Sequence, residues 1–421
     1  MQASISKSEA LGKAAAPSSK SYTIRGLICG ALADGKSEII SPLASDDTAA
    51  AINVLKKVGV TIRQRKKSWM VSGGDLQPPT SDLFCGDSAA TLRFMTAFGA
   101  IIPGICHLTA GPSLSRRPVK ILIDALRMLG VNCSSNGGLP PVTVEGGIFE
   151  GGTTSLPGNI SSQYVSALLQ IAPFAAEGVT IKLTTPLESR PYVMMTLDTM
   201  QWFGITVAFN KNLDTFEILP HKYKPTRYKV EGDWSSASYL LALGALAGEV
   251  EVDNLDMESL QGDRMLVGFL QDMGASVVSG RNAIVVKHSK LKAIKADLSD
   301  CIDLLPTMAV LAATAGGTSE LTGIERARLK ESDRVAAVKE GLQRMGINVT
   351  EEANRLTITG GKPKGTLIDS KGDHRIAMAF SSLGTLVGDT EIGGAECVAK
   401  TYPEFWDVFK NLGGKVKIDG Q

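Results

Sequence analysis

The sequence has almost no net charge and no long apolar run. Its 421 residues carry 44 Lys or Arg and 43 Asp or Glu, which gives a formal net charge of +1. This balance argues against bulk binding to nucleic acid or to an anionic membrane. No apolar stretch approaches the roughly 20 residues that a membrane helix needs, and the polar residues 1–20 lack a signal-peptide core. We therefore expect a cytoplasmic globular protein in which any basic site is local.

Cysteine and histidine are too few and too scattered to indicate a disulfide framework or a metal centre. The six cysteines show no paired spacing, and the four histidines lack the spacing of metal ligands. Neither a P-loop nor a GxGxxG motif after a strand is present, which disfavours nucleotide-dependent chemistry. The sequence therefore predicts reduced thiols and no metal site.

A helix-like segment that ends in glycine and is followed by a β-prone run occurs six times. Each glycine suits the left-handed conformation that closes many helices. A second helix start, marked by small or oxygen-bearing residues, recurs with the same period. Because this period of about 70 residues exceeds that of solenoid repeats, each copy can be a compact βαβαββ unit. The glycines are Gly59, Gly130, Gly204, Gly274, Gly346 and Gly413.

Length and repeat together predict two domains. A chain of 421 residues is too long for one ordinary core, and six units most simply form two domains of three. The polar, proline-containing segment 221–227 lies about halfway along and is the expected boundary. We predict an α/β fold with a first domain over residues 14–226 and a second over 227–421. The pattern alone does not assign the first residues of the chain.

Lysine and arginine collect where helices are predicted to begin. A helix N-terminus carries unpaired N–H groups and a partial positive charge, so several such ends on one face make an anion site. Glu331 and Asp303 stand among the cations, where carboxylates normally stay ionised and can serve as general base and acid. The pattern predicts a cleft for small, multiply anionic ligands. The cations are Lys20, Arg25, Arg93, Arg116, Arg117, Lys330, Arg334, Arg375 and Lys400.

The segment Leu329–Arg334 concentrates this pattern. It places two cations and two carboxylates just before an amphipathic run over 335–345. Ser332 is the predicted N-cap of that helix. Lys330 and Arg334 are one turn apart and can face the same anion. Taken alone, the segment is more typical of a solvated first turn, and it is the repeat that favours a functional interpretation.

Six short motifs occur in order along the chain. They are Pro17-Ser-Ser-Lys20-Ser21-xxx-Arg25, Leu114-Ser-Arg-Arg117-Pro118, Ser161-Ser162-Gln163, Leu329-Lys-Glu-Ser-Asp-Arg334, Asp373-His-Arg375 and Lys400-Thr401. Together they resemble the 5-enolpyruvylshikimate-3-phosphate synthase family, from about residue 13 to 408. The resemblance implies two domains of three βαβαββ units that close over the substrates, with the active site in the interdomain cleft. It also implies that residues 1–13 return to the second domain.

The resemblance implies one reaction. The enolpyruvyl group of phosphoenolpyruvate would pass to the 5-hydroxyl of shikimate 3-phosphate, with release of phosphate, by addition and elimination through a tetrahedral intermediate. This is a step of the shikimate pathway to chorismate and the aromatic amino acids. No metal or organic cofactor is implied. The expected partners are the two small-molecule substrates, without nucleic acid or membrane, and we expect a monomer.

The resemblance also implies roles for individual residues. Asp303 would take the 5-hydroxyl proton, and Glu331 with Lys20 would handle proton transfer at the methylene carbon. Which of these three performs each transfer stays open. Shikimate 3-phosphate would be held by Lys20, Ser21, Arg25, Ser161, Ser162, Gln163, Ser189, Tyr192, Asp303 and Lys330. Phosphoenolpyruvate would be held by Lys20, Arg93, Arg117, Gln163, Arg334, Arg375 and Lys400.

The segment Gly86-Asp87-Ser-Ala89 departs from the family pattern. Members of the family often have Asn and Gly where this chain has Asp87 and Ala89. Asp87 fits an anion site only if its side chain caps the helix while the backbone N–H binds the ligand. Ala89 adds a methyl group to a wall that the family keeps small, so we expect poor inhibition by glyphosate, which occupies the phosphoenolpyruvate site.

Two alternative functions are considered, one a sister enzyme and the other from a different class of protein. UDP-N-acetylglucosamine enolpyruvyl transferase shares the repeat and the co-substrate. It typically has Lys-Asn where this chain has Lys20-Ser21. It also typically has a reactive cysteine in the loop that here spans 111–118, and this chain has no cysteine in that loop. A catalytically inactive anion-binding protein is the second alternative. The complete set of Lys20, Arg117, Asp303, Glu331, Arg334 and Arg375 argues against it.

Overall fold

The computed structural model describes residues 1–419, and these form six four-stranded sheets. Every sheet combines one parallel pair of strands with two antiparallel pairs. One of them consists of β6 (Leu83–Phe84), β7 (Gly104–Thr109), β9 (Leu139–Gly146) and β8 (Asn132–Asn136), in this order. Strand β6 runs parallel to β7, while β9 is antiparallel to both β7 and β8. This is the sheet that a βαβαββ unit makes, so the predicted fold class is confirmed.

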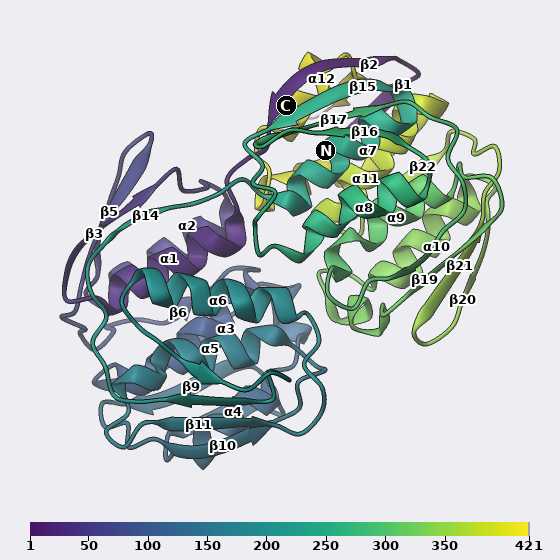
Figure 1. Ribbon diagram of the computed structural model, residues 1–421. Coiled ribbons are helices and arrows are strands. Elements are labelled where there is room, and N and C mark those ends of the chain that lie inside the picture. The colour runs from purple at the N-terminus through teal and green to yellow at the C-terminus, as the bar shows by residue number, and fades with distance from the viewer. Residues whose placement is uncertain (420–421) are drawn as a thin grey trace. The chain divides into compact units, whose positions relative to one another are not determined.

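The chain folds into two compact units (Figure 1). The first unit is Ser18–Val230, and the second unit is Met1–Pro17 together with Glu231 onward. The boundaries expected from the sequence, 13/14 and 226/227, fall a few residues earlier in the chain. Strand β14 (Arg227–Lys229), just after the second of these, pairs with β3 (Gly35–Ile40) in the first unit. In contrast, β1 (Gln2–Ser6) and β2 (Ala10–Ala15) pair with strands of the second unit.

In the first unit, three helices are buried along nearly their whole length, and their apolar side chains form most of its core. They are α1 (Lys20–Leu32), α3 (Ala89–Phe98) and α5 (Ser162–Ile171). The other helices are α2 (Asp46–Lys57), α4 (Lys120–Met128) and α6 (Arg190–Trp202). Its strands are β3 (Gly35–Ile40), β4 (Thr61–Gln64), β5 (Ser68–Gly73), β6 (Leu83–Phe84), β7 (Gly104–Thr109), β8 (Asn132–Asn136), β9 (Leu139–Gly146), β10 (Gly152–Leu156), β11 (Val179–Leu183), β12 (Ala208–Phe209), β13 (Thr215–Ile218) and β14.

The second unit repeats this plan around α7 (Trp234–Ala247), α9 (Leu305–Ala312) and α11 (His374–Val387). Each of these helices is buried on almost every face, and most of the side chains that it buries are apolar, as expected for a helix enclosed by other elements. The remaining helices are α8 (Leu266–Asp272), α10 (Arg334–Arg344) and α12 (Phe405–Asn411). Its strands are β1 (Gln2–Ser6), β2 (Ala10–Ala15), β15 (Gly248–Asp253), β16 (Ser276–Ser279), β17 (Ala283–Lys287), β18 (Lys295–Asp297), β19 (Thr318–Thr322), β20 (Asn348–Glu351), β21 (Arg355–Thr359), β22 (Leu367–Asp369), β23 (Thr390–Gly393) and β24 (Lys415–Asp419).

The six repeat glycines close their helices as predicted. All six have a φ between 81° and 97°, a conformation that residues with a Cβ atom adopt only at a cost. The chain can therefore turn sharply out of each helix and into the next strand. Within residues 1–419, every helix is too short or too polar to cross a membrane.

Candidate active site

Within residues 1–419, six helices begin at side-chain caps, and five of these helices carry predicted site residues, whereas α6, which follows Ser189, lacks such a cap. A Ser or Asp oxygen accepts a backbone N–H in the first turn, so the remaining N–H groups at that end still present partial positive charge. The capping residues are Ser19 for α1, Ser88 for α3, Ser161 for α5, Asp233 for α7, Asp333 for α10 and Asp373 for α11. The structure thus supplies the anion-attracting helix ends on which the prediction of an anion site depended.

One predicted cap is wrong. Asp333, not Ser332, caps α10, because its backbone is extended and its Oδ1 accepts the Ala336 N–H at 3.0 Å. The Ser332 hydroxyl instead donates to Asp373 Oδ2 at 3.1 Å. Ser332 therefore links the start of α10 to the start of α11.

In the first unit, Arg25 gathers two other predicted residues. It is buried in α1, and its Nη1 and Nη2 donate to the carbonyl oxygens of Ser21 and Tyr192, each at 3.0 Å. Its Nε donates to Thr196 Oγ1 at 2.7 Å, and the guanidinium stacks over the Phe94 ring. These contacts fix the start of α1 against the first turns of α6.

Arg93 gathers a second group in the same unit. Its Nη1 donates to Ser161 Oγ at 3.2 Å and to Gln163 Oε1 at 2.7 Å. The guanidinium also lies 4.9 Å from the centre of the Tyr164 ring, and the Tyr164 hydroxyl donates to Pro118 O at 2.5 Å. Since Pro118 directly follows Arg117, these contacts connect α3, the start of α5 and the loop of Arg117.

The other predicted residues of the first unit also lie at helix ends. Ser162 opens α5, and Ser189 precedes α6 with a φ of 52°, which is strained for serine. Arg117 follows the short 3₁₀ turn Leu114–Arg116 and is buried. Lys20 opens α1, and its Nζ lies 2.9 Å from Oδ2 of the buried Asp47 in α2. Asp47 is a neighbour of Lys20 that the sequence did not predict.

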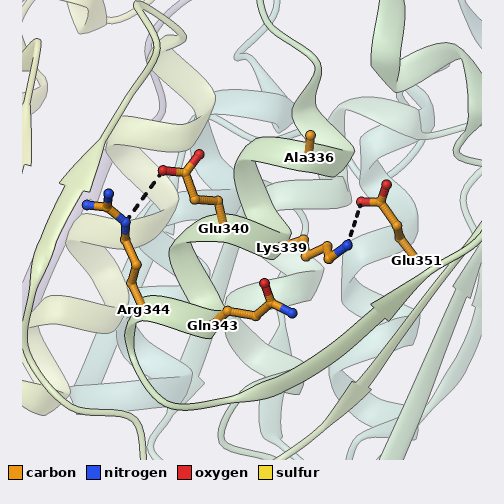
Figure 2. Close-up of a pocket in the computed structure, with 6 residues that line it drawn as sticks. All are labelled: Ala336, Lys339, Glu340, Gln343, Arg344 and Glu351. Carbon is orange, nitrogen blue, oxygen red and sulfur yellow. Dashed lines mark ion pairs between the residues drawn. The ribbon is translucent and has the colours of Figure 1, made fainter.

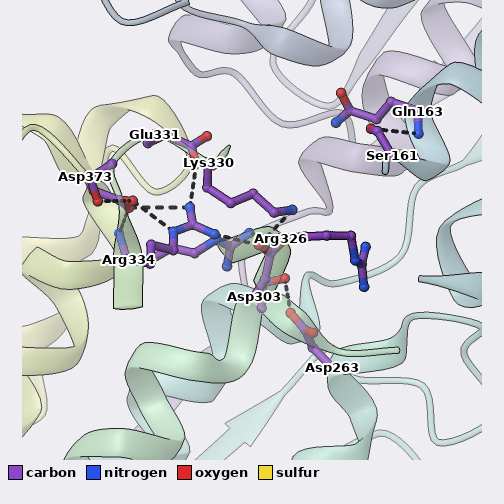
Figure 3. Close-up of polar contacts among 12 residues, drawn as sticks. Ser161, Gln163, Asp263, Asp303, Arg326, Lys330, Glu331, Arg334 and Asp373 are labelled. Carbon is purple, nitrogen blue, oxygen red and sulfur yellow. Dashed lines mark hydrogen bonds and ion pairs between the residues drawn. The ribbon is translucent and has the colours of Figure 1, made fainter. Parts of the chain in front are cut away.

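In the second unit, Arg334 binds three carboxylates (Figure 3). Its Nη1 donates to Asp303 Oδ1 at 2.6 Å, its Nη2 to Glu331 Oε2 at 2.5 Å and its Nε to Asp373 Oδ2 at 2.8 Å. Burial by itself would lower the pKa of Arg334, but the three carboxylates raise it above its ordinary value. Arg334 therefore remains a cation although it is almost completely buried.

Asp303 faces three cations. Besides Arg334, it contacts Arg375 Nη2 at 3.1 Å and Lys330 Nζ at 3.4 Å. Burial would raise the pKa of Asp303, but the charges of Arg375, Lys330 and Arg334 hold it well below its ordinary value. Burial lowers the pKa of Lys330 to about 8, against the opposing effect of Asp303. The arrangement favours an ionised Asp303 beside a lysine that titrates close to neutral pH.

Glu331 connects Arg334 with the last of the predicted cations. Its Oε1 lies 3.7 Å from Lys400 Nζ, and Lys400 ends the 3₁₀ segment Ala395–Lys400 ahead of α12. Contacts thus join all of the predicted residues of the second unit: Asp303, Lys330, Glu331, Arg334, Arg375 and Lys400. We had assigned no role to Asp373 or to Tyr239, whose hydroxyl accepts from Arg375 Nη1 at 3.2 Å.

Known proteins match the chain over its whole length. The model of the family EPSP synthase (3-phosphoshikimate 1-carboxyvinyltransferase) matches residues 6–409. A 3-phosphoshikimate 1-carboxyvinyltransferase of Dehalococcoides mccartyi is 52% identical over 421 residues, which are 100% of each chain. A protein of the same name from Methanothermobacter thermautotrophicus is 41% identical and covers 99% of this chain and 100% of its own. The structure of an EPSP synthase from Acinetobacter baumannii has a TM-score of 0.84 and 28% identity, with 100% of both chains covered.

Proposed function

Because the chain belongs to the EPSP synthase (3-phosphoshikimate 1-carboxyvinyltransferase) family, we propose a division of roles among its charged residues. The chain transfers the enolpyruvyl group of phosphoenolpyruvate to shikimate 3-phosphate, a step of the shikimate pathway to the aromatic amino acids. This predicted activity is confirmed by relatives that are 51% and 52% identical over the full length. The alternative, UDP-N-acetylglucosamine enolpyruvyl transferase, is set aside on the same ground.

Shikimate 3-phosphate is assigned to hydroxyl and cationic side chains at helix starts. Ser161 and Ser162 at the start of α5 offer hydroxyl donors beside the positive end of the helix. The contacts of Arg25 with Ser21 and Tyr192 support a common role for these three residues. The full assignment is Lys20, Ser21, Arg25, Ser161, Ser162, Gln163, Ser189 and Tyr192, with Asp303 and Lys330.

Phosphoenolpyruvate is assigned to six cations and Gln163. Its phosphate and carboxylate need several positive groups, and arginine can bind each of them with two parallel hydrogen bonds. Glu331 already bonds to Arg334 and lies near Lys400. An arriving anion therefore competes with Glu331 for these cations and loosens the carboxylate for proton transfer. The cations are Lys20, Arg93, Arg117, Arg334, Arg375 and Lys400.

The proton transfers are assigned to Asp303, Glu331 and Lys20. Asp303 accepts the proton of the 5-hydroxyl of shikimate 3-phosphate as the hydroxyl oxygen attacks C2 of phosphoenolpyruvate. Glu331 or Lys20 supplies a proton to the methylene carbon of phosphoenolpyruvate. The tetrahedral intermediate then loses a methyl proton to the same group and expels phosphate. The charges of Arg375, Lys330 and Arg334 outweigh burial and keep Asp303 ionised, so its carboxylate is free of a proton when the substrate binds, although the same cations make it a weaker base.

The assay for this function is phosphate release from phosphoenolpyruvate. We expect release with shikimate 3-phosphate and none with UDP-N-acetylglucosamine or without an acceptor. The opposite acceptor preference would overturn the assignment. The proposal also treats the two compact units as the two domains and the enzyme as a cytoplasmic monomer. Light scattering coupled to size exclusion tests its mass against the 44.5 kDa of one chain.

A further inference from the structure

A buried carboxyl group without an assigned role lies next to the proposed base. Asp263 belongs to the 3₁₀ segment Gly262–Met265 and is 2% exposed. Figure 3 shows it beside Asp303, and the charge of Asp303 acts on it. The Ser235 hydroxyl, near the start of α7, donates to Asp263 Oδ2. The other oxygen, Oδ1, is buried and has no hydrogen-bond partner among the residues that the structure describes.

The surroundings of Asp263 disfavour its negative charge. Burial raises its pKa to about 7, with Asp303 and then Asp233 acting in the same direction, whereas Arg375 and the Ser235 hydroxyl act against this rise. Arg375 already donates to Asp303. The thiol of Cys301 is also near, and its own pKa is raised by burial and then by Asp263. Two neighbouring carboxyl groups cannot both ionise easily when the guanidinium that acts on both of them contacts only one, here Asp303.

We propose that Asp263 is a positioning residue that stays neutral while Asp303 acts as the base. This inference rests on the role of Asp303 in the proposed function. With a neutral Asp263, the pair carries one negative charge, and Arg375 stays directed at Asp303. An ionised Asp263 draws Arg375 toward itself and places a second negative charge near cations assigned to anionic substrates. Both effects weaken binding and catalysis.

The first test compares wild type with Asp263→Asn, which has nearly the same shape and cannot ionise. We expect the ratio of kcat/KM for phosphoenolpyruvate, variant over wild type, to rise about tenfold between pH 6 and pH 8, with the rise beginning near pH 7. Lys330 titrates in both proteins, so its effect cancels in this ratio. Asp272→Asn, an exposed change in the neighbouring helix α8, is the control and should give a constant ratio. A constant ratio for Asp263→Asn overturns the inference.

Two further measurements keep the inference testable if the assay or the variant fails. The urea midpoint of Asp263→Asn relative to wild type does not depend on activity. Since folding raises the pKa of Asp263 from 3.8 to about 7, ionisation destabilises wild type progressively over this range. The midpoint of Asp263→Asn should therefore increasingly exceed that of wild type from pH 4.5 to 7.5, and the difference between the two midpoints should then level off. A difference that does not depend on pH counts against the inference.

If Asp263→Asn does not fold, Ser235→Ala provides a second test. In wild type, kcat/KM should fall on the alkaline side as Asp263 ionises, and in Ser235→Ala this fall should occur at higher pH, because the variant lacks a hydrogen bond to the ionised form of Asp263. An unmoved fall rejects the inference.

Discussion

Leu114 N–H donates to Asp87 Oδ1 at 2.9 Å, and the same oxygen accepts the Ser113 N–H at 3.0 Å. Asp87 thus caps the 3₁₀ turn that leads to Arg117, while Ser88 caps α3. Gly111 permits this approach, because a Cβ at that position would lie 2.8 Å from Asp87 Oδ1. The departure from the family at position 87 therefore concerns the loop before Arg117. The condition that Asp87 caps its own helix is not met, because Ser88 does so.

Replacing Asp87 separates this positioning role from a general effect on folding. Asp87→Ala removes the acceptor for two N–H groups, and each hydrogen bond to a charged group contributes about 1.5–3 kcal/mol. We expect the KM for phosphoenolpyruvate to rise at least about tenfold, with a smaller change in kcat. Asp87→Asn keeps an acceptor oxygen and should stay within about threefold of wild type. Steady-state kinetics of both variants decide the matter, since equal losses in the two would show that the charge, not the acceptor, is needed.

Glu331→Gln should leave the fold intact and lower kcat by about 10²–10⁴-fold, the usual contribution of a general acid or base. A matched control lies on the exposed side of α10, where Glu340 pairs with Arg344 at 3.4 Å (Figure 2). Glu340→Gln breaks two surface ion pairs, with Arg344 and Lys371, each of which contributes at most about 1 kcal/mol. Its kcat should therefore be unchanged. Single-turnover phosphate release measures both variants. Near-normal turnover of Glu331→Gln would remove Glu331 from the proposed mechanism.

The affinity for shikimate 3-phosphate should fall as the pH rises through about 8. Burial lowers the pKa of Lys330 to about this value, so the side chain is a cation below it and neutral above it. We expect the Kd, measured by calorimetry from pH 6.5 to 9.5, to rise by up to about tenfold per pH unit on the alkaline side. Lys330→Arg keeps its charge throughout this range and should show a smaller rise. If the Kd of wild type and of Lys330→Arg rises equally with pH, the group that titrates is not Lys330.

The sequence predicted those features that depend on local chemistry. The repeat glycines need a left-handed backbone, and Ser19, Ser161 and Asp373 are ordinary helix caps, so the fold and the cation-bearing helix starts could be read from patterns. The partners of the carboxylates could not be predicted from the sequence, because these contacts depend on which helix starts lie next to each other in the folded chain. Only the packing of α1 on α2 gives Asp47 its partner Lys20, and only the packing of α7 beside Gly262–Met265 gives Asp263 its partner Ser235. The choice of Asp333 over Ser332 as a cap likewise depends on Asp373, which draws the serine hydroxyl away.

Two glycine-to-alanine changes should have opposite effects on stability. Alanine favours a helix by about 1 kcal/mol over glycine, and Gly268 in α8 is exposed with nothing within 4 Å of an added Cβ. Gly268→Ala should therefore raise the urea midpoint slightly. At Gly341 in α10, the added Cβ would lie 2.5 Å from Cζ of Phe380, a buried side chain of α11. Since overpacking a core costs about 1–3 kcal/mol, Gly341→Ala should lower the midpoint despite its gain in helix propensity. A higher urea midpoint for both variants would show that α10, the helix that begins with Arg334, can shift relative to α11 at little cost.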